Sequence, residues 1–243
     1  GLISLGSAVR IRLSLPKKMN QKYKFVLQRL FYYVYGEKFF KRLTYDWKNY
    51  PSRTQIIQKI INQQKYKTYL EIGCDNDENF SKIIIDKKTG IDPLKGGTLR
   101  MTSDKFFEKN IKNFDLIFLD GLHTYEQTIK DIDNSLRYLN INGVILIHDC
   151  LPTKIWNQIV PRIYGHWNGD VWKAIVHSRT YDHADTYTCA ADHGIGIIFK
   201  RKNTNRLIIE EKDFKKLKFK HYYNNHKKFM NIISYDEIEK VFY

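Results

Sequence analysis

One segment of the chain constrains the fold more than any other: FDLIFLDGLHTYEQTIKDIDNSLRYL, residues 114–139. It opens with the apolar run of residues 116–119, stops at Asp120 and reaches His123 shortly afterwards. Apolar residues then recur at the spacing of a helix, at Ile129, Ile132, Leu136 and Leu139. A short apolar run followed at once by an amphipathic helix is typical of a strand buried on both faces of a parallel sheet. The segment therefore predicts an α/β fold in which a strand delivers a carboxylate and an imidazole to its carboxyl end.

Three further segments repeat the pattern of an apolar run that stops at polar residues. They are TYLEIG, which ends at Gly73, KTGIDP, which reaches Asp92, and GVILIHDC, which follows the turn at Asn142 and Gly143. Near-continuous apolar strands separated by amphipathic helices predict a mostly parallel sheet with helices on both faces. After these strands, TYTCA and GIGIIFK predict a C-terminal antiparallel hairpin.

The chain divides into three regions. Residues 1–66 are expected to form an N-terminal helical cap region. Residues 67–201 hold the alternating strands and helices, and they are expected to form the domain that binds the ligand. Residues 202–243 are basic and aromatic, and we expect a helical tail packed on the same domain.

Two helix starts carry the residues of a capping box, in which a Ser or Thr side chain and a Gln or Glu three residues later satisfy free backbone N–H groups. Ser52 and Gln55 stand at the start of SRTQIIQKIINQQ. Thr124 and Gln127 stand at the start of the helix that follows Asp120. Both pairs predict where a helix begins.

Composition limits the class of protein. The chain has 243 residues, enough for one α/β domain with additional elements. It has no apolar run of about 18 residues, so no transmembrane helix is predicted. Cys74, Cys150 and Cys189 are far apart, as in proteins of a reducing cytoplasm, where we expect this one. The net charge of +15 favours anionic partners, although scattered lysines are also typical of solvated faces.

Titratable residues follow all four predicted parallel strands, at the edge where open parallel sheets bind ligands. They are Glu71, Asp75, Asp92, Asp120, His123, His148 and Asp149. Asp92 stands roughly 20 residues after Gly73, the position from which a carboxylate binds ribose hydroxyls. The loop after Gly73 reads CDNDE, and its acids would repel a pyrophosphate. These strand ends therefore favour S-adenosylmethionine, which carries a sulfonium and an amino-acid tail, over a dinucleotide.

The chain resembles the class I S-adenosylmethionine-dependent methyltransferases in five segments: YLEIGCDNDENFSKI, GIDPLKGGTLRMTSDKFF, FDLIFLDGLHTYEQTIKDI, NGVILIHDCLP and GDVWKAIV. Within that class it is similar to the bacterial sugar and small-molecule O-methyltransferases of the macrocin type. The resemblance implies a Rossmann-like class I methyltransferase fold, S-adenosyl-L-methionine as the cofactor, and O-methylation as the activity.

The resemblance also implies which residues bind the cofactor: Glu71, Gly73, Asp75, Asp92, Ser103, Asp104 and Asp120. Asp92 would bind the ribose, and Ser103 with Asp104 would lie at the adenine. The chain departs from the family in the first motif, where Asp75 and Asp77 stand in place of glycines. The methionine end of the cofactor is therefore expected to be held differently, and binding without catalysis stays an alternative.

Methyl transfer to a hydroxyl requires a group that removes the hydroxyl proton. The candidates are Asp120, His123, His148 and Asp149, and His123 is the preferred base because an imidazole titrates near neutral pH. Related O-methyltransferases often hold a divalent cation at these strand ends, which implies a metal site at Asp120, Asp149 and His148. A histidine ligand suits Mn²⁺, Fe²⁺ or Zn²⁺ better than Mg²⁺. The alternative without metal is a hydrogen-bonded base network of His148, Asp149 and His123.

Four residues are candidate contacts to the acceptor: Trp167, Asp170, Trp172 and His193. Aromatic faces suit sugar rings, and Asp170 can accept hydrogen bonds from hydroxyls, although both tryptophans would also suit a cap packed on the sheet. The expected partner is a small hydroxylated acceptor such as an anionic or nucleotide-linked sugar, and a homodimer is compatible with the basic tail. The positive net charge makes nucleic-acid methylation an alternative function. However, LDGLHTY lacks the prolines of enzymes that methylate bases, and the sequence contains no signature of an RNA-binding module. A non-catalytic protein that binds anionic ligands is the third possibility.

Overall fold

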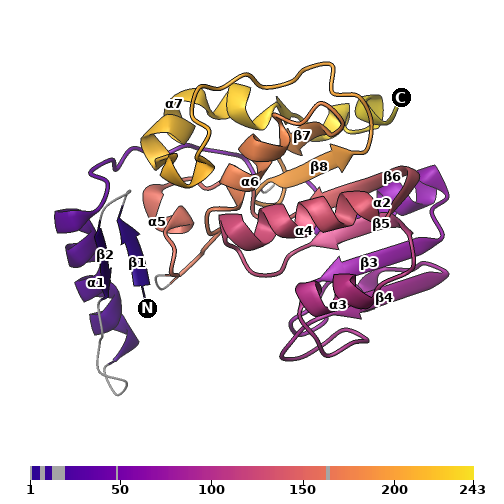
Figure 1. Ribbon diagram of the computed structural model, residues 1–243, viewed down its shortest axis with the longest axis horizontal. Helices are drawn as coiled ribbons and strands as arrows, with labels where there is room; N and C mark the ends of the chain where they lie inside the picture. Colours follow the sequence, from indigo (N-terminus) through magenta and orange to yellow (C-terminus); the bar gives the residue numbers. More distant parts are fainter. Residues whose placement is uncertain (1, 6–8, 13–19, 48, 163–164) are drawn as a thin grey trace.

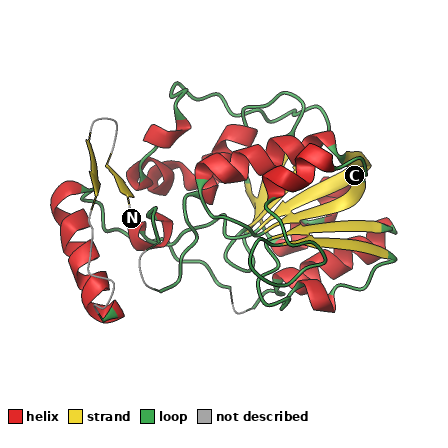
Figure 2. Ribbon diagram, turned by 60° about the horizontal axis from the view of Figure 1, so that its bottom comes forward, coloured by secondary structure: helices red, strands yellow, loops and turns green. Residues whose placement is uncertain are grey.

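The computed structural model describes residues 2–5, 9–12, 20–47, 49–162 and 165–243 (Figure 1). Within these residues the main sheet has seven strands, in the order β4-β3-β5-β6-β8-β7-β9. In chain order the strands are β3 (Thr68–Ile72), β4 (Lys87–Ile91), β5 (Phe114–Leu119), β6 (Leu139–Ile147), β7 (Asp185–Cys189), β8 (Ile195–Phe199) and β9 (Ile232–Ile233). Helices cover both faces of this sheet (Figure 2), so the mostly parallel α/β architecture predicted from the sequence is confirmed.

The carboxyl ends of the four parallel strands lie side by side because the register aligns them. Ile72 pairs with both Ile91 and Leu119, and Leu119 pairs in turn with Ile147. The residues that follow these four positions therefore stand at one edge of the sheet: Gly73, Asp92, Asp120 and His148. This is the edge at which open parallel sheets bind their ligands.

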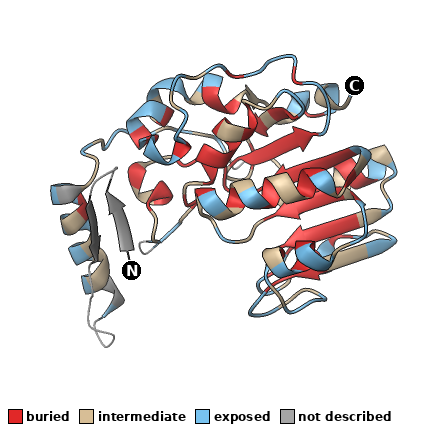
Figure 3. Cartoon of the chain, in the orientation of Figure 1, coloured by how far each residue is buried: buried red, intermediate tan, exposed pale blue. Residues whose placement is uncertain are grey.

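Alternate residues of the central strands enter two separate cores. On β5, Leu116 and Phe118 pack in one core, and Ile117 and Leu119 pack in the other. Helix α2 (Arg53–Gln64) packs in the core that contains Leu116 and Phe118. Helices α4 (Tyr125–Arg137) and α6 (Val171–Ser178) pack in the core on the opposite face of the sheet. The central strands are buried on both faces (Figure 3), as their near-continuous apolar sequences require.

The predicted hairpin is present and extends the sheet. Strand β8 lies between β6 and β7 and is antiparallel to both, and β9 pairs in parallel with β7. Because Gly196 pairs with Ile147, the turn before β8 lies beside the end of β6. The backbone N–H of Leu151 donates to the carbonyl of His193 at 2.9 Å, which fixes this turn at the ligand-binding edge.

The N-terminal region differs from the helical cap expected for residues 1–66. It holds the helices α1 (Gln21–Tyr35) and α2, but strands β1 (Leu2–Leu5) and β2 (Val9–Arg12) form a separate antiparallel hairpin. The expectation for residues 1, 6–8, 13–19 and 48 falls outside the described residues. Between α1 and α2 the described chain is largely irregular, because the aromatic residues there pack against other segments instead of forming a helical face; Phe39, for example, contacts Tyr223 and Phe219.

One of the two predicted capping boxes is present. At the start of α2, the side-chain oxygen of Gln55 accepts from the backbone N–H of Ser52 at 3.0 Å. At the start of α4 the predicted box is absent, because Gln127 turns away to donate to Asp131 at 3.1 Å. Asp170, distant in sequence, caps this helix by accepting from the backbone N–H of Tyr125 at 2.7 Å. A tertiary contact has replaced the local one.

The C-terminal region packs against the same sheet. Its main helix is α7 (Phe219–Met230), whose residues Phe219, Tyr222 and Met230 are completely buried. The remaining short elements are α3 (Ser103–Lys109), α5 (Ile155–Gln158), η1 (Phe80–Lys82), η2 (Phe214–Lys216), η3 (Tyr235–Glu237) and η4 (Glu239–Phe242). Among the described residues, no helix has the length and apolar character that crossing a membrane requires.

Candidate active site

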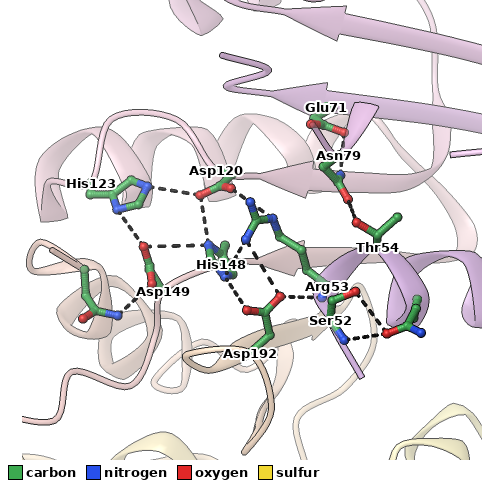
Figure 4. Close-up of polar contacts among 12 residues, drawn as sticks. Ser52, Arg53, Thr54, Glu71, Asn79, Asp120, His123, His148, Asp149 and Asp192 are labelled. Carbon is green, nitrogen blue, oxygen red and sulfur yellow. Dashed lines mark hydrogen bonds and ion pairs between the residues drawn. The ribbon is translucent and has the colours of Figure 1, made fainter. Parts of the chain in front are cut away.

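Four of the predicted residues meet at the carboxyl ends of β5 and β6 (Figure 4). Asp120 Oδ1 lies 3.1 Å from His123 Nε2 and 3.2 Å from His148 Nδ1. Asp149 Oδ2 lies 3.3 Å from His123 Nδ1 and 3.7 Å from His148 Nδ1. Two carboxylates and two imidazoles therefore alternate around one centre.

Two further residues complete this cluster from elsewhere in the chain. Arg53, the first residue of α2, places its Nε 3.7 Å from Asp120 Oδ2 and its Nη1 3.8 Å from Asp192 Oδ2. Asp192, in the turn before β8, lies 3.6 Å from His148 Nε2. Their role depends on the packing of α2 and of the β7–β8 turn against β6, which local sequence does not reveal.

The electrostatics of the cluster separate the two imidazoles. Burial raises the pKa of Asp120, but His148 and then His123 outweigh this effect and hold the pKa well below its ordinary value. Burial lowers the pKa of His148, but its carboxylate neighbours, Asp120 first, raise it to about 10. His148 is therefore an imidazolium at neutral pH, and it forms ion pairs with the surrounding carboxylates. The pKa of His123 is also raised, because its contacts with Asp120 and Asp149 outweigh its burial.

Glu71 is not directed at open space. It is buried and accepts hydrogen bonds from the Tyr69 hydroxyl and from Asn79 Nδ2, at 2.5 Å and 2.8 Å. Burial raises the pKa of Glu71 to about 7. Asn79 in turn accepts from the Thr54 hydroxyl at 2.7 Å (Figure 4). The chain of bonds ties α2 to β3, so Glu71 positions the first strand end.

Asp92 closes the end of β4 and binds the neighbouring loops. Its Oδ1 accepts from the backbone N–H groups of Leu94 and Lys95, and its Oδ2 accepts from that of Asp75 at 3.1 Å. These hydrogen bonds overcome burial and lower the pKa of Asp92. A carboxylate has about four acceptor sites, so roughly one remains for a ligand in this arrangement.

The acidic loop after Gly73 is held by the loop of residues 93–97. Lys95 Nζ lies 2.7 Å from Asp75 Oδ1, and the backbone N–H of Gly97 donates to Asp77 Oδ1 at 2.6 Å. The residues that stand where a glycine-rich motif would have glycines therefore serve as partners for the neighbouring loop. The Lys95 and Asp75 side chains are more than half exposed, and pairs of this kind contribute little to stability.

The expected adenine residues lie at the start of α3. Ser103 is buried and Asp104 is partly exposed. Gln127 donates to both, at 3.2 Å and 3.1 Å, and Lys130 pairs with Asp104 at 2.7 Å. They contact α4 and take no part in the histidine cluster.

The four candidate acceptor residues separate into two kinds. Trp167 stacks on His123, with ring centroids 5.5 Å apart and planes at 13°, and His193 is partly exposed at the same edge. Trp172 is completely buried in the core, and Asp170 is occupied by the cap of α4 and an ion pair with Lys173. The structure therefore corrects the interpretation of Trp172 and Asp170: both stabilise the fold, and neither faces the cluster.

Two sets of three side chains, among the described residues, have possible metal-ligand atoms within 4.8 Å of one another: Asp120, His123 and Asp149; and Asp149, His166 and His193. The set expected from the resemblance included His148 in place of His123. His148 Nδ1 lies 3.2 Å from Asp120 Oδ1 and 3.7 Å from Asp149 Oδ2. Sequence reasoning missed His166, although its position one residue before Trp167 was a signal.

The strand order confirms the fold class predicted from the sequence. A parallel sheet in the order β4-β3-β5-β6, closed by an antiparallel β8 inserted before β7, is the Rossmann-like sheet of class I methyltransferases. Residues 49–150 match the model of a family described as a methyltransferase domain. These residues, which include strands β3 to β6 and the ends that carry Asp92, Asp120 and His148, are therefore similar to a methyltransferase domain.

Comparisons with other proteins add distant likenesses. No curated protein matches the chain. Among solved structures, the Podospora anserina methyltransferase PaMTH1, bound to SAH, is 16% identical with a TM-score of 0.49, over 79% of this chain and 100% of that one. A putative caffeoyl-CoA O-methyltransferase from Staphylococcus aureus is 16% identical with a TM-score of 0.48, over 74% and 95%.

Proposed function

We propose that the protein transfers a methyl group from S-adenosyl-L-methionine to a hydroxyl of a small acceptor, such as a sugar or nucleotide-linked sugar. The observation that carries the proposal is the cluster of Asp120, His123, His148 and Asp149 at the carboxyl edge of a methyltransferase sheet. Bound S-adenosylmethionine supplies an activated methyl group, so the protein's task is to align the acceptor and take its proton.

The residues along the edge of the sheet suit this cofactor in type and position. Asp92 offers a carboxylate with a lowered pKa at the place of the ribose, and the acids of the first loop suit a cationic ligand. Gly73 has φ +91°, and a Cβ there would come within 2.3 Å of the Asp120 carbonyl, so only glycine fits between the two loops. Full binding by Asp92 requires the loop of residues 93–97 to release some of its hydrogen bonds.

His123 is the residue that we assign as the base. It lies between Asp120 and Asp149, and its raised pKa makes it a stronger proton acceptor than a free imidazole. His148 is less suited because its carboxylate neighbours Asp120, Asp192 and Asp149 raise its pKa to about 10, which keeps it protonated. The imidazolium and the guanidinium already neutralise the carboxylates, so the proposal uses the base network and no cation between Asp120 and Asp149.

The acceptor would lie against the aromatic side of the cluster. Trp167 covers one face of His123, and Arg162 lies over the Trp167 ring at 5.9 Å. An indole face suits a sugar ring, and the arginine suits an anionic substituent on it. The net charge of +15 would attract such an acceptor from solution.

The first test is calorimetric titration of the purified protein with S-adenosylmethionine and with its demethylated product. We expect binding that Asp92→Ala removes and that Asp86→Ala, a change of an exposed acid near the same strand, leaves intact. Binding would justify a methyl-transfer screen that begins with nucleotide-sugars. Equal affinity in wild type and Asp92→Ala would disprove the assigned cofactor site, and no binding at millimolar ligand would favour the non-catalytic alternative.

A further inference from the structure

We propose that Asp149, His166 and His193 form a binding site for a transition-metal ion of the Zn²⁺ class, which shares Asp149 with the base network but takes its two histidine ligands from outside it. One ligand atom from each of the three side chains lies within 4.8 Å of the others. The two imidazole rings face each other with centroids 4.2 Å apart and planes at 36°. Small side-chain adjustments would bring such a set to the bond lengths of about 2.0–2.2 Å that zinc requires.

Two asparagine side chains hold His166 and Asp149 in place. Asn157 donates to the carbonyl of His166 at 2.9 Å, and Asn168 donates to Asp149 Oδ1 at 2.8 Å, so the His166 loop is fixed to the end of β6. Asp149 and His193 both have left-handed backbone conformations, with φ of 60° and 62°. Residues other than glycine adopt this conformation at a cost, and such strain concentrates at functional sites.

The donor set selects the class of metal. Two imidazole nitrogens and one carboxylate oxygen suit Zn²⁺, Mn²⁺, Fe²⁺, Co²⁺ or Ni²⁺, whereas Mg²⁺ prefers oxygen ligands alone. His166 is exposed and His193 partly exposed, while Asp149 is buried. An ion therefore has a path from solvent to the three ligands, and water would complete its coordination.

The competing set, Asp120, His123 and Asp149, is less available. Both ring nitrogens of His123 face carboxylates, at 3.1 Å and 3.3 Å, and Trp167 covers the ring. His193, by contrast, makes ring contacts with Trp47 and His148 and, within the described part of the chain, no side-chain hydrogen bond. Its nitrogens are free to bind an ion without breaking an existing interaction.

The test is metal binding itself, so it does not depend on methyl transfer. Metal-free protein would be titrated with Zn²⁺ by calorimetry and with Co²⁺ by its visible absorption, and the bound metal counted by mass spectrometry. We expect one ion per chain, and we expect His166→Ala and His193→Ala each to weaken binding by roughly a hundredfold or more, since even indirect changes at metal sites cost 10–100-fold. Far-UV circular dichroism would check that each variant is folded.

Two controls make the outcome decisive. His183→Ala removes an exposed histidine that also contacts a carboxylate, Asp182 at 2.9 Å, and it should leave binding unchanged. His123→Ala should also retain the ion. Loss of binding in His123→Ala with retention in His166→Ala would overturn the proposal in favour of the competing set. Failure of the wild-type protein to bind any ion stoichiometrically would overturn it outright.

Discussion

Asp120 links the groups on which the proposed chemistry depends. It contacts His123, His148 and Arg53, each of which comes from a different part of the chain. Its low pKa keeps it charged, so it raises the pKa of both imidazoles. The difference between the imidazoles arises from the remaining neighbours, because His148 also contacts Asp192 and His123 does not.

Removal of His123 should abolish turnover without weakening cofactor binding. We expect His123→Ala to lower kcat by about 10²–10⁴-fold, the usual contribution of a general base. The wild-type kcat should rise with pH through the raised pKa of His123, because only the neutral imidazole accepts a proton. Turnover and calorimetric affinity for the demethylated cofactor provide the two measurements, and His183→Ala is the matched control. Equal loss of both would show that His123 is a structural residue.

The raised pKa of Glu71 predicts that the free energy of unfolding depends on pH. Its pKa rises from 4.5 in the unfolded chain to about 7 in the folded one, so the folded state holds the proton more tightly. The stabilisation is therefore present below pH 4.5 and lost as pH rises through 7, by roughly 3 kcal/mol. Glu71→Gln cannot ionise, and its stability relative to wild type should improve by about 2–3 kcal/mol between pH 5 and pH 8.

Urea unfolding at pH 5 and at pH 8 would measure this difference. Glu108→Gln is a suitable control, since that side chain is exposed. A relative stability of Glu71→Gln that stays constant between the two pH values would show that Glu71 ionises as easily in the folded protein as in the unfolded one.

At the scale of elements, α2 connects the core with the site. Its apolar residues Ile56, Ile57, Ile60 and Ile61 are buried against the sheet. Its first turn carries Arg53 to Asp120 and Asp192, and Thr54 to Asn79. The capping box at Ser52 fixes where the helix begins, and so it also fixes which side chains of the first turn face the strand ends.

The other end of α2 offers a stabilising change. Lys65 follows the helix in a left-handed conformation, with φ 55°, and its backbone N–H donates to the carbonyl of Ile61. Glycine adopts this conformation without strain, so Lys65→Gly should stabilise the protein by about 0.5–1 kcal/mol. Gln64→Gly, one residue earlier within the helix, should instead destabilise it by about 1 kcal/mol. Thermal unfolding distinguishes the two signs, and destabilisation by both changes would contradict the assigned helix end.

At the scale of the whole molecule, the C-terminal region completes the fold. Tyr222 on α7 packs against Trp172 on α6, with ring centroids 5.0 Å apart, and its hydroxyl lies 3.4 Å from that of Tyr45. Three regions distant in sequence therefore meet at one aromatic contact. Helix α7 buries its aromatic residues and exposes its basic ones, as expected of a helix that packs on the domain.

Tyr222→Ala should destabilise the whole domain. The side chain is completely buried, and loss of a buried aromatic ring typically costs about 3–5 kcal/mol. Tyr243→Ala, at a side chain that is 96% exposed, should change stability by less than about 0.5 kcal/mol. Urea unfolding followed by circular dichroism provides the measurement. An unchanged midpoint in Tyr222→Ala would show that α7 is not part of the cooperative unit.

The sequence by itself determined the sheet, the strand ends and most of the polar groups on them. Buried parallel strands require apolar runs and end where polar residues begin, so Asp92, Asp120 and His148 could be assigned to one edge before any coordinates. The register then places them side by side without further information.

Only the tertiary structure decided which partners those groups have. Arg53 and Asp192 reach the cluster from a helix and a turn that approach it through long-range packing, and Asp170 caps α4 in place of the local Thr124 and Gln127. Trp172, on α6, is buried in the core, whereas Trp167, in the loop before that helix, stacks on His123. Local sequence fixes backbone conformation and strand ends, whereas contacts between distant segments depend on how whole faces pack, and no short pattern encodes that.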